Sequence, residues 1–192
     1  MPGLTDLLRQ ACEKRLLRAL DVQFAHMLAD ESQPALMLAA AWLSAEAGEG
    51  HVCLPLSQLT PSALFGGRHP ELANAIWQAA GAPQEWSALL LNSEAVSDGS
   101  QATPLVLHQQ RLYLNRMWQG EGKVAEFIAA DPAIDPPDAT RLRQILDQLF
   151  GQQPDDWQKI AAAVAITRKI SVISGGPGTG KTTTVAKLLA AL

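Results

Sequence analysis

The sequence has 192 residues, of which 47% are hydrophobic, enough apolar material for one large or two small domains with buried cores. Its longest apolar stretches fall far short of the roughly 18 consecutive residues that a membrane-spanning helix needs. The N-terminal residues mix charged side chains with leucines, unlike the uncharged core of a signal peptide. We therefore expect a cytoplasmic protein with no membrane partner.

Charge is distributed unevenly along the chain. Residues 1–150 hold 10 Lys and Arg against 17 Asp and Glu, whereas residues 151–192 hold 5 against 2. The basic part suits phosphate groups, and the acidic part suits a nucleic-acid backbone poorly. Cys12, Cys53 and the four scattered histidines lack the spacing of a disulfide framework, a zinc site or a catalytic triad. Nuclease chemistry is not supported either, because no carboxylates cluster for a metal.

Most of the first 130 residues show the apolar periodicity of amphipathic helices. Residues 51–56 predict a short edge strand, because Pro55 cannot donate to a neighbouring strand. Residues 105–107 and 111–114 predict the two strands of a β-hairpin. The predicted helices cover residues 4–17, 21–28, 34–47, 71–80, 83–91 and 117–130, and they carry four tryptophans that we interpret mainly as core residues: Trp42, Trp77, Trp86 and Trp118.

A change of composition marks a boundary after the last of these helices. Residues 131–138 contain three prolines and three aspartates, which is typical of a linker or a long surface loop. A helix over residues 139–150 and a break at residues 151–154 follow. Asp155 and Asp156 then favour a helix start, because acidic side chains accept hydrogen bonds from the first turn. The helix that follows places Trp157, Ile160, Ala161 and Val164 on one apolar face.

The motif that carries chemistry lies near the C-terminus. Residues 170–174 form a β-branched run that predicts a strand, and residues 175–182 fit the pattern G-x-x-x-x-G-K-[ST]. A triphosphate is wrapped by backbone N–H groups, which requires glycines that adopt positive φ and allow close approach, here Gly175, Gly178 and Gly180. Lys181 would reach the β- and γ-phosphates, and the Thr182 hydroxyl would ligate Mg²⁺. The helix over residues 182–191 would point its positive N-terminus at the phosphates.

A glycine-rich turn without a ligand is the alternative interpretation. The agreement of loop, preceding strand run and following helix favours nucleotide binding. Hydrolysis also needs a Walker B acid, and no Asp or Glu follows Asp156. Residues 28–31, Leu-Ala-Asp-Glu, look superficially like such a strand end, but they end a helical pattern.

From Asp156 onward, the sequence Trp157-Gln158-Lys159, the β run and Gly-Gly-Pro-Gly-Thr-Gly-Lys-Thr-Thr-Thr resemble the start of a superfamily 1 helicase motor domain. Residues 50–56 (Gly-His-Val-Cys-Leu-Pro-Leu) and residues 111–117 (Arg-Leu-Tyr-Leu-Asn-Arg-Met) narrow the resemblance to the RecD family. RecD proteins are the alpha subunits of exodeoxyribonuclease V, the RecBCD complex. The resemblance covers nearly the whole chain.

The resemblance implies a fold, an activity and partners. The fold is mixed and mostly α: a helical N-terminal domain with a small β-hairpin, followed by the first strand, P-loop and helix of a RecA-like α/β motor domain. The expected parts are a RecC-facing domain (residues 1–130), a linker and connecting helix (131–154) and the start of the ATP-binding domain (155–192). The implied function is ATP-dependent 5′-to-3′ DNA helicase activity in double-strand-break repair and recombination, with RecB, RecC and DNA ends as partners.

The resemblance also assigns roles to residues. Gln158 matches the glutamine that reads the adenine edge, for which an amide suits because it donates and accepts at once. Lys181 and Thr182 would act in catalysis, Thr182 would hold Mg²⁺, and ATP would be bound by the following residues: Gly175, Gly176, Pro177, Gly178, Thr179, Gly180, Lys181, Thr182, Thr183 and Gln158.

A complete helicase of this kind needs Walker B acids, a second RecA-like domain and an arginine finger. Because none is present, we expect a truncated chain that is catalytically incomplete. Two alternatives remain open: a non-catalytic module that docks on the other subunits, and another kind of P-loop NTPase.

Overall fold

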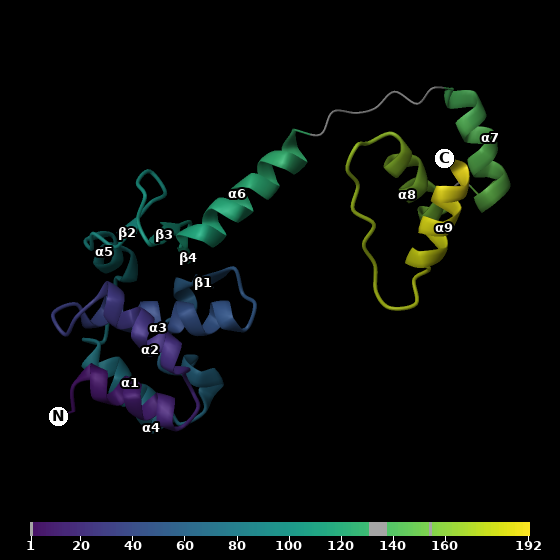
Figure 1. Cartoon of the computed structure of the whole chain (residues 1–192). Helices are drawn as coiled ribbons and strands as arrows, with labels where there is room; N and C mark the ends of the chain where they lie inside the picture. Colours follow the sequence, from purple (N-terminus) through teal and green to yellow (C-terminus); the bar gives the residue numbers. More distant parts are fainter. Residues whose placement is uncertain (1, 131–137, 154) are drawn as a thin grey trace. The chain divides into compact units, whose positions relative to one another are not determined.

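The structure is a computed structural model that describes residues 2–130, 138–153 and 155–192. The chain forms two compact units, Met1–Gly122 and Lys123–Leu192 (Figure 1). The predicted linker falls almost wholly outside the described residues, as does Pro154 of the predicted break. In the described part of the chain, no helix is both long and apolar enough to cross a membrane.

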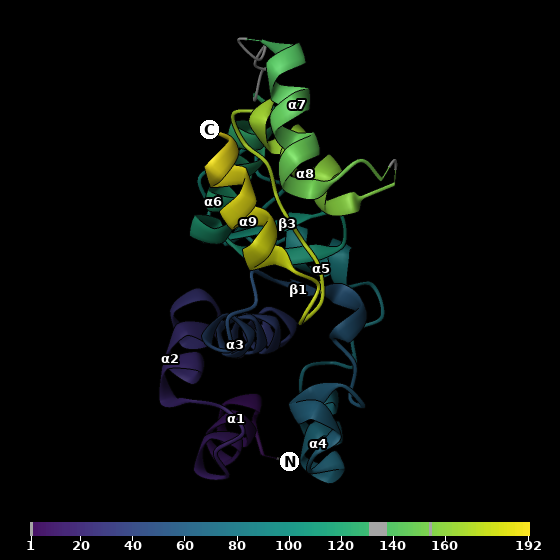
Figure 2. The ribbon, with the colours of Figure 1, turned by 90° about the vertical axis from the view of Figure 1, so that its right-hand side faces the viewer.

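The first unit is built around one buried helix. Every residue from 36 to 44 of α3 (Pro34–Gly48) is buried, because this helix is apolar on all sides. Pro34 suits the first turn, where its missing N–H has no acceptor to lose. α2 (Ala19–Leu28) packs along α3, and α1 (Leu4–Glu13) packs on α2 and on α4 (Pro70–Ala79), as the turned view in Figure 2 shows for α2 and α3. The prediction of a mostly helical fold is therefore confirmed.

A small mixed sheet covers part of α3. Its strands are β1 (Cys53–Pro55), β2 (Val96–Ser97), β3 (Leu105–His108) and β4 (Arg111–Leu114), in the order β1-β4-β3-β2. β3 and β4 form the predicted hairpin, and β1 is an edge strand, as Pro55 indicated. β2, which pairs parallel to β3, was not predicted because two residues carry no periodicity.

The hairpin turn contains two residues rather than the three between the predicted strands. Gln109 and Gln110 have φ of 47° and 61°, the left-handed region that a two-residue hairpin turn of type I′ requires. Glycine or asparagine usually fills such turns. Here contacts with the rest of the unit hold the conformation. The Leu56 N–H donates to the backbone carbonyl of Gln110 at 2.9 Å, and the Ser87 hydroxyl donates to the side-chain carbonyl of Gln110 at 3.1 Å.

Two predicted helix boundaries in the first unit were wrong by three residues or more. α1 ends at Glu13 rather than at residue 17, because Arg15 turns into the left-handed region at φ 56°. α5 (Trp86–Leu91) begins three residues later than predicted, after Ala82 at φ 46°. Trp42, Trp77 and Trp86 are buried, which confirms that they are core residues. Two 3-10 turns, η1 (Leu56–Gln58) and η2 (Leu64–Gly67), complete this unit.

α6 (Asn115–Ala129) leads from the first unit into the second. In the second unit, α7 (Ala139–Phe150), α8 (Trp157–Ile166) and α9 (Lys181–Ala191) pack on one another. The predicted strand at residues 170–174 was wrong: the described residues form no strand there, since a strand needs a neighbour to pair with. The apolar face of α8 forms but is largely exposed, with Trp157 78% accessible.

A charged network ties the α1–α2 corner to α3. Asp21, fully buried, accepts hydrogen bonds from the Arg18 backbone at 2.8 Å, from the Arg18 guanidinium at 2.6 and 3.1 Å, and from the Ser44 hydroxyl at 2.7 Å. Arg18 also donates to the Ser44 carbonyl at 2.7 Å. Burial acts to raise the pKa of Asp21, but the hydrogen bonds from Arg18 and Ser44 outweigh it and hold this pKa below 3.8.

Asp21→Asn should therefore destabilise the first unit by about 2 kcal/mol at pH 7, because it leaves hydrogen-bond donors of Arg18 and Ser44 without a charged acceptor. A carboxylate with a lowered folded pKa stabilises fully above its unfolded pKa, and this stabilisation is lost as the pH falls through the folded value. The difference between wild type and variant should thus shrink in acid below about pH 4. Urea unfolding followed by tryptophan fluorescence measures it.

Asp6→Asn is the matched control. Asp6 pairs with Arg9 at 3.5 Å, but both side chains are about two-thirds exposed, at 64% and 67%. An exposed pair of this kind contributes about 0–1 kcal/mol. Equal losses of stability for the two variants would contradict the assigned role of Asp21.

Candidate functional site

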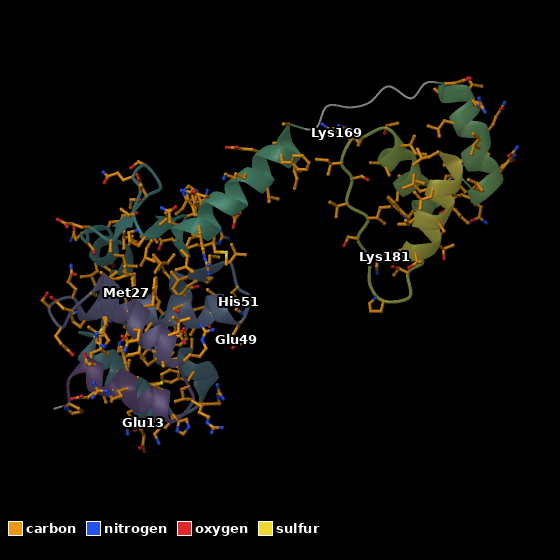
Figure 3. All side chains as sticks on the ribbon, in the orientation of Figure 1. Glu13, Met27, Glu49, His51, Lys169 and Lys181 are labelled. Atoms are coloured by element: carbon orange, nitrogen blue, oxygen red, sulfur yellow. The ribbon has the colours of Figure 1, made fainter. Side chains whose placement is uncertain are left out.

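The glycine-rich loop joins the extended segment after α8 to the first turn of α9. In Figure 3, Lys181 lies where this loop enters α9. Gly178 and Gly180 have φ of 76° and 80°, the left-handed region in which glycine is favoured. Gly180 is the residue that precedes α9, so its conformation sets the direction in which the helix leaves the loop.

Lys181 folds back over the loop. Its ammonium group donates to the carbonyl oxygens of Gly175 and Gly176 at 2.6 and 2.7 Å. The Thr179 hydroxyl donates to the same Gly176 carbonyl at 2.9 Å. A Cβ at Gly175 would lie 2.6 Å from this hydroxyl, so glycine permits the close approach. The Lys181 ammonium group therefore closes residues 175–180 into a ring of backbone. Nearly all residues of this ring are exposed to solvent.

The first turn of α9 presents unpaired donors beside this ring. The backbone N–H groups of Lys181, Thr182 and Thr183 have no acceptor among the described residues, as expected of a first helical turn. Thr184 is buried and its hydroxyl donates to the Gly180 carbonyl at 3.0 Å, which anchors the turn. Thr182 and Thr183 are exposed on the same turn. These donors and the helix dipole favour an anion.

The structure brings Gln158 to the loop from α8. Asp156 begins that helix by accepting hydrogen bonds from the N–H groups of Gln158 and Lys159 at 2.9 and 3.3 Å. The Gln158 amide then donates to the Thr179 carbonyl at 3.4 Å, and it occupies the space that a side chain at Gly180 would need. Residues 22 positions apart in the sequence thus meet at one point.

Sequence reasoning missed two contacts that hold this arrangement. The Lys159 ammonium pairs with Asp147 of α7 and also donates to the Gly151 carbonyl at 2.9 Å. Lys187 of α9 lies over the Phe150 ring, 4.7 Å from its centroid. Neither pair carries a local signal, because each joins two different helices. No group of three or more His, Cys, Asp or Glu in the described residues could hold a metal ion.

Comparison with known proteins relates the whole chain to one family. The sequence profile described as RecBCD enzyme subunit RecD, N-terminal domain, matches residues 13–113, more than half of the chain. The chain belongs to the RecD family. This profile match lies within the first unit and covers α2 to α5 and nearly all of the sheet.

Individual RecD proteins extend the similarity to the second unit. The chain is 31% identical over 186 residues to the RecBCD enzyme subunit RecD of Buchnera aphidicola subsp. Acyrthosiphon pisum, covering 97% of this chain and 31% of the relative. The RecD subunit of Haemophilus influenzae is 31% identical over 98% of this chain and 33% of its own length. That of Mycolicibacterium smegmatis is 34% identical over 92% and 29%. The chain thus spans about a third of the length of these RecD relatives.

Three glycine substitutions should distinguish positions that need left-handed φ from positions that need space beside the backbone. Gly176→Ala should be tolerated, because the new Cβ meets only Thr179 Cγ2 at 3.9 Å and φ is not left-handed. Gly178→Ala should loosen the loop by about 1 kcal/mol through φ alone, since nothing lies within 4 Å. Gly180→Ala should cost a similar amount and also displace the Gln158 amide.

Amide hydrogen exchange over the first turn of α9 measures the loosening, and the side-chain NH₂ resonances of Gln158 report its displacement. Exchange should rise in the second and third variants, and the Gln158 resonances should shift in the third. Equal behaviour of all three variants would contradict this account of the loop.

Proposed function

We propose that the second unit binds ATP, with its triphosphate in the ring of residues 175–180 and against the first turn of α9. The observation that carries the proposal is that the loop, with Gly178 and Gly180 at left-handed φ, brings the Lys181 ammonium group next to the unpaired N–H groups of the first turn of α9. Among the described residues, the ammonium group of Lys181 is bound only by neutral carbonyls of the loop. A charged phosphate oxygen is the stronger acceptor, so Lys181 would exchange carbonyl for phosphate.

Each residue of the ring has a stated role in this proposal. The N–H groups of Gly176, Gly178 and Gly180, with those of Thr179 and Thr183, would donate to phosphate oxygens, and Pro177 would stiffen the turn. The exposed Thr182 hydroxyl, which makes no hydrogen bond to another described residue, would be a ligand of Mg²⁺ alongside the phosphates. Bound ATP supplies the phosphoanhydride whose cleavage drives motion in helicases. We propose binding rather than hydrolysis for these 192 residues, because no acidic residue follows Asp156.

Gln158 is proposed to recognise adenine. Its hydrogen bond to the Thr179 carbonyl is long, at 3.4 Å, and so weak enough to be exchanged for a base edge. A primary amide matches adenine because its NH₂ group donates to N7 while its carbonyl oxygen accepts from the N6 amino group. The contact of the Gln158 amide with the loop at Gly180 supports this role, because adenine would be recognised close to the proposed phosphate site.

The wider role follows from the family. The RecD relatives are named as RecBCD enzyme subunits, and we propose that this chain is part of an ATP-dependent 5′-to-3′ DNA helicase subunit, exodeoxyribonuclease V alpha, acting on DNA ends in repair and recombination. Its proposed partners are RecB and RecC, with the first unit facing RecC. That unit holds 12 acidic against 7 basic residues, which favours a protein partner over the DNA backbone. Co-elution with purified RecB and RecC supports this docking, and separate elution contradicts it.

Lys181→Ala should weaken ATP binding at least tenfold, because it removes the cation at the centre of the ring. Equilibrium titration with a fluorescent ATP analogue and Mg²⁺ measures the affinity. Lys169→Ala is the control: this exposed lysine lies beyond α8 and removes the same charge from the same unit. Equal affinities of the two variants would overturn the assignment of the loop.

A further inference from the structure

α7 lies before the nucleotide-binding segment in the sequence, yet it packs on both helices that bear the site. Leu146 is buried and Leu142, Ile145, Leu149 and Phe150 are half-buried, so apolar side chains of α7 contribute to this packing. Asp138 begins the helix by accepting a hydrogen bond from the Arg141 N–H at 2.9 Å, and Phe150 ends it. Apolar contacts are non-directional, so polar contacts help to fix how α7 lies against α8 and α9.

The strongest of these contacts reaches the turn that carries Gln158. Asp147 is paired with Lys159, and their side chains are only 31% and 20% exposed. Lys159 donates also to the Gly151 carbonyl just beyond α7, so one ammonium group bridges the helix and its end. A half-buried pair with a second hydrogen bond orients its partners more firmly than an exposed pair does. Lys159 directly follows Gln158 in the first turn of α8.

A second contact fixes α7 to the helix of the phosphate loop. The Lys187 ammonium lies 4.7 Å from the centroid of the Phe150 ring, within the range of a cation–π interaction. Because α9 begins at Lys181, this contact relates α7 to the helix that follows the loop. α7 therefore touches one helix that carries Gln158 and one that carries the phosphate ligands.

We propose that Asp147 is a positioning residue of the nucleotide site: through Lys159 it fixes the first turn of α8, and so holds Gln158 at the distance from the loop that adenine recognition needs. The inference rests on the proposed function and assigns α7 to the site rather than to a connecting segment. Asp147 itself does not touch the nucleotide. Its loss should affect the base more than the phosphates, because the loop and Lys181 are not among its contacts.

The test measures the affinities of the whole chain for three ligands that all carry a triphosphate: ATP, GTP and inorganic tripolyphosphate. Each ligand competes against a fluorescent ATP analogue. Wild type should prefer ATP to GTP. Asp147→Asn should reduce this preference about fivefold and leave the affinity for tripolyphosphate unchanged, the size expected for one misplaced hydrogen bond. Asp147→Glu keeps the charge and should restore the preference.

Asp155→Asn is the matched control, because it removes the same charge from an exposed acid near Gln158 that makes no ion pair among the described residues. A ligand-free readout accompanies the titrations. The N–H groups of Gln158 and Lys159 are bonded to Asp156, and their hydrogen exchange should speed up in Asp147→Asn if α7 holds this turn.

The possible results distinguish a failure of the Asp147 role from a failure of ATP binding. If Asp147→Asn keeps the ATP preference, or weakens ATP and tripolyphosphate equally, the positioning role of Asp147 is overturned while ATP binding stands. If wild type binds tripolyphosphate no better than Lys181→Ala does, the proposed function is overturned and the role in adenine recognition falls with it. Unchanged hydrogen exchange in the first turn of α8 of Asp147→Asn would contradict the Asp147–Lys159 link, whatever the ligand titrations show.

Discussion

The arrangement of the second unit depends on the contact between Gln158 and the glycine-rich loop at Gly180. The amide of Gln158 fills the space beside Gly180, and the left-handed φ of this glycine directs α9 away from the ring. A larger residue at position 180 would displace Gln158 and strain the backbone together. One position thus sets where Gln158, the glycine-rich loop and the N-terminus of α9 lie relative to one another.

The two units achieve order in different ways. In the RecD N-terminal domain, the apolar α3 is surrounded by helices and a sheet, and the charged Arg18–Asp21–Ser44 network fixes one corner of that core. In the second unit, the buried residues of α7, α8 and α9 are Leu146, Ala162 and Thr184, one for each helix. Half-buried apolar side chains, the Asp147–Lys159 ion pair and the Lys187–Phe150 contact join these helices.

The sequence predicted elements whose signals are local. The hairpin over residues 105–114 follows from its leucine- and tyrosine-rich strands, and α3 from an apolar run of helical length. The left-handed φ of Gly178 and Gly180 was expected from the glycine pattern of the loop. Residues 170–174 show the limit of such reasoning, because β-branched composition favours a strand but pairing requires a second strand. Asp147–Lys159 and Phe150–Lys187 could not be predicted either, since side-chain contacts between helices depend on their packing.

The central claim is that ATP binds where the loop, α9 and Gln158 meet. Titration of the isotopically labelled chain with Mg²⁺ and ATP, followed by amide NMR, tests it most directly. The account predicts saturable shifts in the backbone amides of residues 175–184 and in the side-chain amide of Gln158, with the core of the first unit unaffected. Saturable shifts confined to the first unit, or none at all at millimolar ATP, would contradict it.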